Sequence, residues 1–194
     1  MKKLLLLDNY DSFTHNLLHL LQMVRPDYKI VIMRNRDKNI YREKWDGIIV
    51  SPGPGTPEET GLLNDFFETV IIKEEIPYLG ICLGMQFLAY FYGVTVDRTQ
   101  PYHGRTVNIE HDNKALFSDL PNPYKVMRYN SLGVKKDDLM GSPLEVLALE
   151  EDKNDVMALK HRTLPFLGVQ FHPESFLTEQ ADRLINNFFE AYLD

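Results

Sequence analysis

Cysteine is nearly absent from this sequence of 194 residues, which contains a single thiol at Cys82. One cysteine cannot form an internal disulfide, so small disulfide-dependent secreted folds are excluded and a reducing compartment is favoured. Clusters of basic residues are also missing, and 21 lysines and arginines stand against 28 acidic residues, for a net charge of −7. This acidic balance argues against nucleic acid as a partner, because binding to phosphate backbones needs concentrated positive charge.

Long hydrophobic runs are missing as well. The N-terminus has the basic start of a signal peptide, but its leucine run, Leu4–Leu7, meets Asp8. A run of this length is too short for a signal peptide or a membrane span. We therefore interpret residues 2–7 as a first β-strand and expect a cytoplasmic protein without a membrane partner.

The bulk composition is that of a globular protein. Hydrophobic residues make up 44% and charged residues 25% of the chain, which indicates neither disorder nor a fibrous repeat. A chain of this length can bury a core without disulfides or metals. We expect one domain that spans residues 1–194.

Short apolar runs alternate with helical patterns through the first half of the chain, which is typical of parallel strands joined by crossover helices. Strands are predicted at residues 2–7, 29–33, 48–51 and 78–81, and helices at 13–24, 62–74 and 85–92. The remainder predicts strands at 106–110, 125–129, 144–149, 156–160 and 166–171, and a last helix at 179–192. The expected fold class is α/β, with a single-domain, open, mostly parallel sheet and flanking helices.

Two details of the helices are also predicted. Asp11 or Ser12 is expected to cap the first helix, because short polar side chains accept the free N–H groups of a helix start. An aromatic surplus in the helix at 85–92 is expected to pack in the core, and it comprises Phe87, Tyr90, Phe91 and Tyr92.

The sharpest local signal is the segment Gly80-Ile81-Cys82-Leu83-Gly84, between a predicted strand and a predicted helix. Small residues on both sides of a nucleophile define an elbow, here with cysteine in place of serine. Glycines permit a tight turn that exposes the central side chain at the sheet edge, and the helix N-terminus beneath it favours a thiolate. Taken alone, the segment also fits a small buried cysteine beside packing glycines.

A histidine and a carboxylate follow the last predicted strand, in the segment Phe171-His172-Pro173-Glu174-Ser175. His172 can take the proton of a thiol and later return one to a leaving amine, while Glu174 fixes the imidazole tautomer and stabilises its charged form. The other histidines lack paired metal-ligand spacing, so no metal and no cofactor is expected; they are His15, His19, His103, His111 and His161.

The loop Pro52-Gly53-Pro54-Gly55-Thr56-Pro57 follows the third predicted strand. Its two glycines can present backbone N–H groups to a ligand, because no Cβ blocks the approach. One donor from this loop and another from the amide of Leu83 would form an oxyanion hole. The loop also fits a stiff turn without a ligand. It is not a phosphate-binding loop, because the Gly-Lys-Ser/Thr ending is absent.

Taken together and in order, these segments resemble the class I glutamine amidotransferases. Within that family the sequence is most similar to the glutaminase subunits of anthranilate synthase and aminodeoxychorismate synthase. The resemblance covers nearly the whole chain. It rests on the segments Asp8-Asn9-Tyr10-Asp11-Ser12-Phe13-Thr14, Ser51 to Pro57, Gly80-Ile81-Cys82-Leu83-Gly84-Met85-Gln86, His103-Gly104, Arg128-Tyr129-Asn130-Ser131-Leu132 and Gly168-Val169-Gln170-Phe171-His172-Pro173-Glu174-Ser175.

The resemblance implies a flavodoxin-like fold and a catalytic triad of Cys82, His172 and Glu174. In that mechanism the thiol attacks the side-chain amide of L-glutamine, ammonia leaves, and water hydrolyses the glutamyl thioester. The implied partner is a large synthase subunit that binds chorismate and uses the ammonia, because the chain is too short to contain that synthase as well.

The resemblance also implies where glutamine binds. The backbone amides of Gly55 and Leu83 are the implied oxyanion donors, and Gln86 with the backbone around Ser131 and Leu132 is implied to hold the α-amino and α-carboxylate groups. The full implied substrate-binding set is Gly53, Pro54, Gly55, Leu83, Gln86, Ser131 and Leu132. The family often has histidine at the positions of Met85 and Asn130, so neither residue is given a role in proton transfer.

Other functions remain open at this point. The triad also fits a free-standing glutaminase or γ-glutamyl hydrolase, or the glutaminase of another synthase. A non-catalytic interaction module or redox sensor with an oxidisable Cys82 is a further alternative, against which the intact His172 and Glu174 argue. Within the leading interpretation, the product is anthranilate, 4-amino-4-deoxychorismate or both, because the large subunit determines it.

Overall fold

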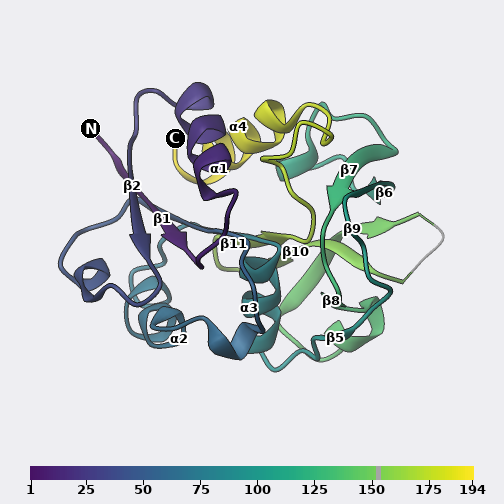
Figure 1. Cartoon of the computed structure of the whole chain (residues 1–194), viewed down its shortest axis with the longest axis horizontal. Coiled ribbons are helices and arrows are strands. Elements are labelled where there is room, and N and C mark those ends of the chain that lie inside the picture. The colour runs from purple at the N-terminus through teal and green to yellow at the C-terminus, as the bar shows by residue number, and fades with distance from the viewer. Residues whose placement is uncertain (152–153) are drawn as a thin grey trace.

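A nine-stranded sheet runs through the computed structural model, which describes residues 1–151 and 154–194 (Figure 1). From one edge to the other its strands are β2 (Lys29–Arg34), β1 (Lys3–Asp8), β3 (Gly47–Val50), β4 (Tyr78–Ile81), β11 (Phe166–Val169), β10 (Val156–His161), β9 (Leu144–Glu150), β6 (Arg105–His111) and β7 (Tyr124–Arg128). The strands from β2 to β11 are parallel, and every pair from β11 to β7 is antiparallel. The expected open α/β sheet is therefore confirmed, and antiparallel strands extend its parallel half.

Burial explains why the two halves have different sequence patterns. All residues of β3 and β4 are buried, because helices cover both faces of the parallel half, and both strands are continuous apolar runs. In β6, exposed and less exposed positions alternate towards its end, as expected for a strand with one solvated face. The parallel half is thus a rigid support from which water is excluded. The loops at its strand ends are where a functional site is expected.

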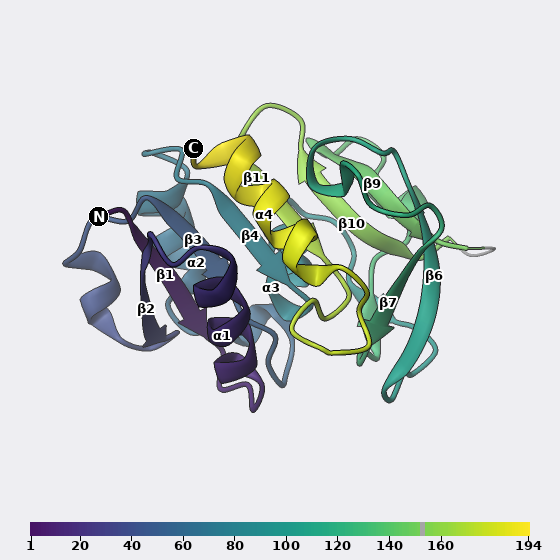
Figure 2. The same cartoon turned by 90° about the horizontal axis from the view of Figure 1, so that it is seen from above.

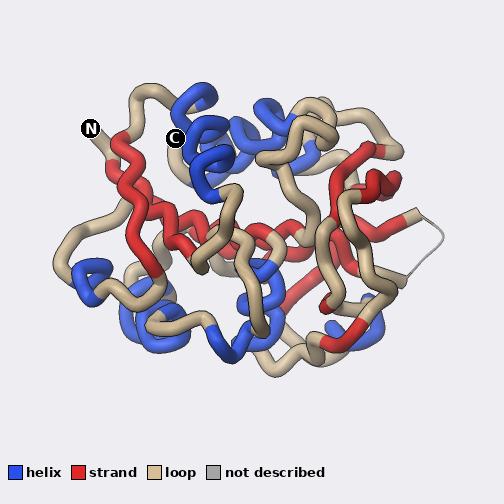
Figure 3. The backbone as a smooth tube through the Cα atoms, viewed as in Figure 1, coloured by secondary structure: helices blue, strands red, loops and turns tan. Residues whose placement is uncertain are grey.

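Helices cover both faces of the sheet, as Figures 1 and 3 show. One face carries α1 (Thr14–Val24) and α4 (Ala181–Tyr192), which lie across the sheet in the view of Figure 2. The other face carries α2 (Leu63–Phe66) and α3 (Leu83–Phe91). No helix within the described ranges is long and apolar enough to cross a membrane.

Short elements complete the chain. They are the π-helical turn η3 (Phe67–Ile71), the 3₁₀ turns η1 (Lys38–Tyr41), η2 (Pro57–Glu59), η4 (Ala115–Phe117) and η5 (Lys136–Leu139), and a two-stranded ribbon of β5 (Asp97–Arg98) and β8 (Leu132–Gly133). The ribbon was not predicted, because strands of two residues have no measurable periodicity.

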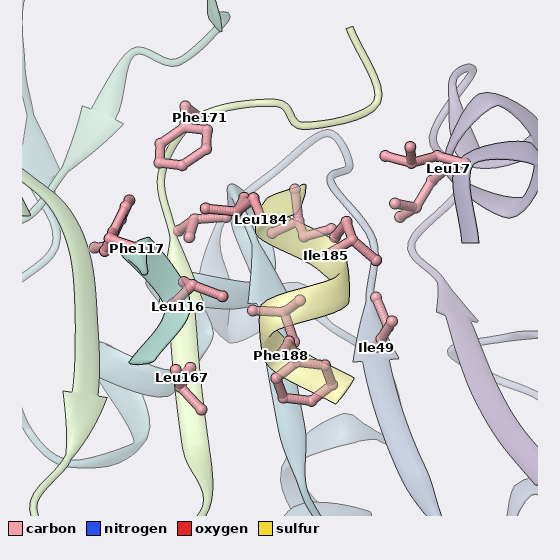
Figure 4. Packing of buried hydrophobic residues seen from close by; sticks show 14 of the residues in the cluster. Leu17, Ile49, Leu116, Phe117, Leu167, Phe171, Leu184, Ile185 and Phe188 are labelled. Atoms are coloured by element: carbon pink, nitrogen blue, oxygen red, sulfur yellow. The ribbon is translucent and has the colours of Figure 1, made fainter. Parts of the chain in front are cut away.

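Each face of the sheet has its own hydrophobic core. Figure 4 shows the core beneath α1 and α4, where Leu184, Ile185 and Phe188 lie near Leu17 of α1 and Ile49 of β3. These three α4 residues recur on one helical face, which is why the sequence predicted this helix. The predicted strands and helices are confirmed to within a few residues at their ends, a difference typical of frayed termini.

The predicted cap of α1 is wrong. The helix begins after Phe13, with no side-chain cap, and neither Asp11 nor Ser12 occupies the cap position. The Asp11 carboxylate instead accepts the N–H of Phe13 at 2.9 Å and folds the loop that precedes the helix. The hydroxyl of Thr14 donates to Asp8 at 2.7 Å, so the start of α1 is tied to the end of β1.

The helix predicted at residues 62–74 is irregular. Its α-helical part is α2, and the chain then widens into the π-helical turn η3. This turn begins at Phe67, whose ring contacts those of Tyr78, Phe87, Phe91 and Phe166 at centroid distances of 4.7 to 5.4 Å. Phe67 is therefore the centre of an aromatic cluster in the second core.

The expected burial of the α3 aromatics is confirmed for Phe87, whereas Tyr90 is 40% exposed and that part of the expectation is wrong. Consecutive positions on a helix point in different directions, so a run of aromatic residues cannot be buried throughout.

We predict that Phe67→Ala lowers the free energy of unfolding by about 3–5 kcal/mol, because it leaves a cavity among four rings. Tyr90→Ala on α3 is the matched control, and its exposed ring predicts a change below about 1 kcal/mol. Urea unfolding followed by circular dichroism measures both. Similar losses in the two variants would contradict the central position of Phe67.

Candidate active site

Cys82 occupies a strained turn between β4 and α3. Its backbone angles are φ 52° and ψ −99°, a conformation that L-residues avoid. Two hydrogen bonds hold it there: Cys82 N–H donates to the carbonyl of Val169 at 2.7 Å, and its own carbonyl accepts the N–H of Gln86 at 3.0 Å. The predicted elbow therefore exists as a backbone structure, with the thiol at the carboxyl end of β4 and the start of α3.

The glycines around Cys82 are required by steric contact. A Cβ on Gly80 would lie 2.3 Å from the carbonyl of Gly84, and one on Gly84 would lie 2.8 Å from the carbonyl oxygen of Val50. Gly168 on β11 is equally crowded, because its Cβ would lie 2.5 Å from Cγ of Met85. Contacts this short are incompatible with any side chain, so the elbow requires glycine at all three positions.

His172 and Glu174 form a buried pair beside this turn. Nδ1 of His172 lies 2.6 Å from Oε1 of Glu174, and the side chains are 7% and 2% exposed. The backbone of His172 is held by its N–H, which donates to Met127 at 3.0 Å, and by its carbonyl, which accepts the hydroxyl of Thr178 at 2.7 Å. The carboxylate engages Nδ1, so Nε2 is the ring nitrogen left for chemistry.

The charge state of His172 is set by its neighbours. Burial lowers the pKa of the imidazole, but charge and hydrogen-bond interactions with Cys82 and with Glu174 outweigh this effect and raise the pKa well above its usual range. Nε2 is buried and makes no hydrogen bond of normal geometry within the described residues. Cys82 is nevertheless close enough to affect the pKa of His172, and both residues line the same cavity.

A cavity of about 350 Å³ opens at Cys82. Its walls are Tyr10, Asp11, Ser12, Phe13, Pro52, Gly53, Pro54, Cys82, Tyr129 and His172. These residues come from the loops after β1, β3, β4, β7 and β11, which end at one edge of the sheet. The structure therefore brings Cys82, His172, Gly53 and Pro54 together, as the sequence predicted.

The glycine-containing loop is pinned to the loop after β1. A Cβ on Gly53 would lie 2.5 Å from Cβ of Asn9. The side chain of Asn9 donates to the carbonyl of Ser51 at 2.9 Å, and the N–H of Asn9 donates to the Ser51 hydroxyl at 3.0 Å. Gly55 lies beyond this contact, has a positive φ of 91°, and does not line the cavity.

The other predicted substrate-binding residues do not line the cavity. Leu83 is buried as the first residue of α3, and Gln86 is buried one turn later. Nε2 of Gln86 donates to the carbonyl of Leu132 at 2.9 Å, whereas Ser131 is exposed. The structure thus brings Gln86 and Leu132 into contact, and it leaves Leu83, Gln86, Ser131 and Leu132 outside the cavity wall.

Met85 and Asn130 have structural contacts. Met85 is fully buried against Gly168, where an imidazole would not find the same apolar packing. Asn130 accepts from Nε of Arg128 at 3.1 Å and donates to the carbonyl of Leu132 at 2.8 Å. Asn130 therefore fixes the chain segment that carries Leu132.

Two residues near the thiol were missed as individual candidates. Asp11 lines the cavity, and burial and the charge of Glu174 raise its pKa against the opposing hydrogen bond from Phe13. Gln170 is fully buried, and its Nε2 lies 3.5 Å from Sγ of Cys82. Its sequence position carried a usable signal, because residues two apart in an extended segment point to the same side, and Gln170 is two residues before His172.

A cysteine on a strand–helix turn beside a histidine–carboxylate pair is typical of α/β enzymes that transfer acyl groups through a thiol. The family model for glutamine amidotransferase class-I matches residues 5–192. The chain belongs to this family.

Curated relatives carry related names. The chain is 45% identical over 95% of its length to an aminodeoxychorismate synthase of Streptomyces griseus, and 40% identical over 97% to the bifunctional protein TrpGD of Thermotoga maritima. It spans only 25% and 32% of the length of these two proteins. It is 39% identical over 97% of its length to the aminodeoxychorismate/anthranilate synthase component 2 of Bacillus subtilis, and covers 96% of that protein.

The fold has relatives among solved structures. A crystal structure of a glutamine amidotransferase from Thermotoga maritima superposes with a TM-score of 0.72, at 18% identity, over 98% of this chain and 82% of that one. At this level of identity the likeness concerns the fold.

We predict that Gly80→Ala lowers the free energy of unfolding by about 3 kcal/mol or more, because its Cβ meets backbone that cannot move without breaking the elbow. Gly93→Ala is the control. That glycine has a φ of 74° but no atom within 4 Å of its Cβ, so the loss should be about 1 kcal/mol of backbone strain. Chemical denaturation of both variants provides the comparison, and equal losses would contradict the steric explanation.

Proposed function

We propose that this chain hydrolyses L-glutamine at Cys82 and delivers the ammonia to a chorismate-using synthase. The observation that carries the proposal is the buried His172–Glu174 pair at 2.6 Å beside a thiol on a strained elbow. Family membership supports the glutamine chemistry, and the names of the relatives support the chorismate branch.

The first half of the reaction forms a thioester. The thiolate of Cys82 attacks the side-chain amide carbon of glutamine, and the imidazolium of His172 gives its Nε2 proton to the departing amine. The C–N bond breaks, ammonia leaves, and a glutamyl thioester remains on Sγ. Glu174 holds the imidazole by Nδ1 throughout and stabilises its charged form.

The second half restores the enzyme. Neutral His172 takes a proton from water, the resulting hydroxide attacks the thioester carbon, and the C–S bond breaks with its electron pair returning to Sγ. Glutamate leaves, and the thiolate–imidazolium pair forms again. Both halves pass through an oxyanion, for which the amide of Leu83 at the start of α3 and the backbone of the Gly53–Gly55 loop are the proposed donors.

Glutamine recognition is assigned to residues around this thiol. The amide NH₂ of Gln86 donates both its hydrogens to acceptors within the protein. Its oxygen Oε1 therefore remains to accept a hydrogen bond from the α-ammonium group of glutamine. The backbone at Ser131 and Leu132 completes this contact, and Gly53 with Pro54 forms the wall of the cavity.

The synthase is proposed to dock over the mouth of the cavity. Large apolar side chains are exposed around it: Tyr10 at 49%, Phe13 at 46%, Tyr129 at 46% and Phe176 at 92%. Exposed aromatic groups around a recessed site are typical of a protein interface. A docked partner also shelters ammonia from protonation in water, and the long aminodeoxychorismate synthase of Streptomyces griseus, of which this chain matches a quarter, supports a close association.

The remaining proposals concern the setting of the reaction. Residues 1–194 act as one amidotransferase domain, and the cytoplasm suits the enzyme because a reducing compartment keeps Cys82 as a thiol. The synthase determines whether anthranilate or 4-amino-4-deoxychorismate is formed, since the ammonia is the same for both.

We predict that His172→Ala reduces glutamine hydrolysis by about 10²-fold or more, because it removes the group that transfers protons. Glu174→Gln should reduce glutamine hydrolysis less, because the imidazole is retained and only its orientation and the stabilisation of its charged form are weakened. His161→Gln is the control, as a buried histidine at the end of β10 that contacts Tyr92 and Phe166. Glutamate release in the presence of synthase measures all three, and wild-type turnover in His172→Ala would overturn the assignment.

We predict that glutamate release rises when a chorismate-using synthase is added to the chain and rises again with chorismate, because docking closes the cavity and aligns the oxyanion donors. Phe176→Asp should weaken this activation by placing a charge in the apolar rim. Met140→Asp is the control, since Met140 is 83% exposed next to η5 and outside the rim. Full turnover by the isolated chain, unchanged by synthase and chorismate, would support a free-standing glutaminase instead.

A further inference from the structure

We propose that Gln170 stabilises the thiolate of Cys82 through its side-chain amide, and that Gln86 is a positioning residue that holds this amide in the donating orientation. The inference deepens the proposed function, because it concerns the nucleophile of the same reaction. It adds a residue to the site that neither the motif pattern nor the family relationship singled out.

The contact itself is direct. Nε2 of Gln170 lies 3.5 Å from Sγ of Cys82, a normal distance for a hydrogen bond to sulfur, and both side chains are buried. Gln170 continues the β11 chain, and its N–H donates to the carbonyl of Met157 at 2.9 Å. Its neighbours Val169 and Phe171 are buried in the hydrophobic core, whereas the amide of Gln170 hydrogen-bonds to Gln86 and contacts the thiol.

An amide side chain can present either its oxygen or its nitrogen, and the network around it decides which. The carbonyl of Leu132 can only accept, so the group of Gln86 that faces it at 2.9 Å is the NH₂. The same NH₂ lies 3.1 Å from Oε1 of Gln170 and donates its second hydrogen there. The oxygen of Gln170 is thereby occupied, which leaves its NH₂ for the sulfur.

The chain of hydrogen bonds continues away from the thiol. The carbonyl of Leu132 also accepts from Nδ2 of Asn130 at 2.8 Å, and Oδ1 of Asn130 accepts from Nε of Arg128 at 3.1 Å. Arginine can only donate, so this end fixes the orientation of Asn130 independently. Arg128 is fully buried and ion-paired with Glu150 and with Asp155. The network therefore starts on an anchored charge and ends on the nucleophile.

A fixed donor at Sγ favours the charged form of the sulfur. It stabilises the attacking thiolate and the leaving thiolate in the second half of the reaction, when the C–S electron pair returns to sulfur. Other ionisable groups also face the thiol. His172, backed by Glu174, lies at the end of β11, Tyr10 and Asp11 follow β1, and Tyr129 follows β7. Gln170 differs from all of them because it is a neutral donor whose effect does not depend on pH.

The test is the pH dependence of Cys82 alkylation by iodoacetamide, measured by intact mass on the isolated chain. Cys82 is the single thiol of the chain, so the adduct needs no mapping. Gln170→Met removes the donor at similar volume, and we expect the alkylation midpoint to rise by about one pH unit, with a rate about tenfold lower below the midpoint. Gln170→Glu should raise the midpoint further, because a carboxylate repels the thiolate. The limiting rate at high pH should stay unchanged in both variants.

Gln86→Met tests the positioning role. It frees the amide of Gln170 to turn, so the midpoint should rise in the same direction but by less than in Gln170→Met. Asn187→Leu is the control for general destabilisation, since this buried amide hydrogen-bonds to Leu116 and Ser118 far from the thiol. Its midpoint should equal that of the wild-type chain.

An unchanged midpoint in Gln170→Met and Gln170→Glu would overturn the proposal, as would an equal shift in Asn187→Leu. Should the Gln170 variants fail to fold, Gln86→Met decides alone, and a wild-type midpoint in that variant overturns it. Alkylation needs neither glutamine nor synthase. A chain that fails to supply ammonia to a synthase therefore rejects the proposed function, while an unchanged midpoint rejects the role of Gln170 alone.

Discussion

The backbone of Cys82 is the constraint on which the rest of the site depends. A φ of 52° with a ψ of −99° costs about 1–3 kcal/mol in an L-residue, and the surrounding structure must offset that cost. The parallel sheet does so, because β4 is buried between β3 and β11 and pairs with both. Gly80 and Gly84 allow the two arms of the turn to approach within a distance that any Cβ would prevent. A rigid, fully paired strand can therefore end in a strained residue without relaxing.

The order of the strands then brings the remaining groups to this residue. β11 lies next to β4 although the antiparallel strands intervene in the sequence, and Val169 pairs with Ile81 in register. The residues that follow each strand emerge side by side, which places the segment from Gln170 to Glu174 beside Cys82. Because β7 ends at the same edge, its carbonyl at Met127 accepts the N–H of His172, and Tyr129, which follows the strand, lines the cavity.

Local patterns predicted the parts of this arrangement that depend on local physics. The elbow, the strand before His172 and the glycine-containing loop were recognisable because each needs particular residues at fixed spacing. The hydrogen-bond network from Arg128 to Cys82 was not recognisable in the sequence. It joins Gln86 to Gln170 across 84 positions, and this contact depends on the order of the strands in the sheet. The predictions of a side-chain cap on α1 and of a buried Tyr90 were wrong for a related reason. Tertiary contacts decided between positions that are equivalent in local sequence.

The electrostatics of the site connect its burial with the apolar rim of its cavity. Glu174 and His172 form a buried pair beside Cys82, and burying a charged pair is tolerated only while its polar atoms have partners. Oε1 of Glu174 is paired with His172, whereas its Oε2 has no hydrogen-bond partner within the described residues although the side chain is only 2% exposed. Cys82 itself faces a cavity whose rim carries exposed aromatic rings. Covering that rim lowers the local dielectric and strengthens every interaction at the sulfur, including those with His172 and Gln170. A partner that docks on this apolar rim, as proposed above, would therefore strengthen the interactions of Cys82 with its polar neighbours.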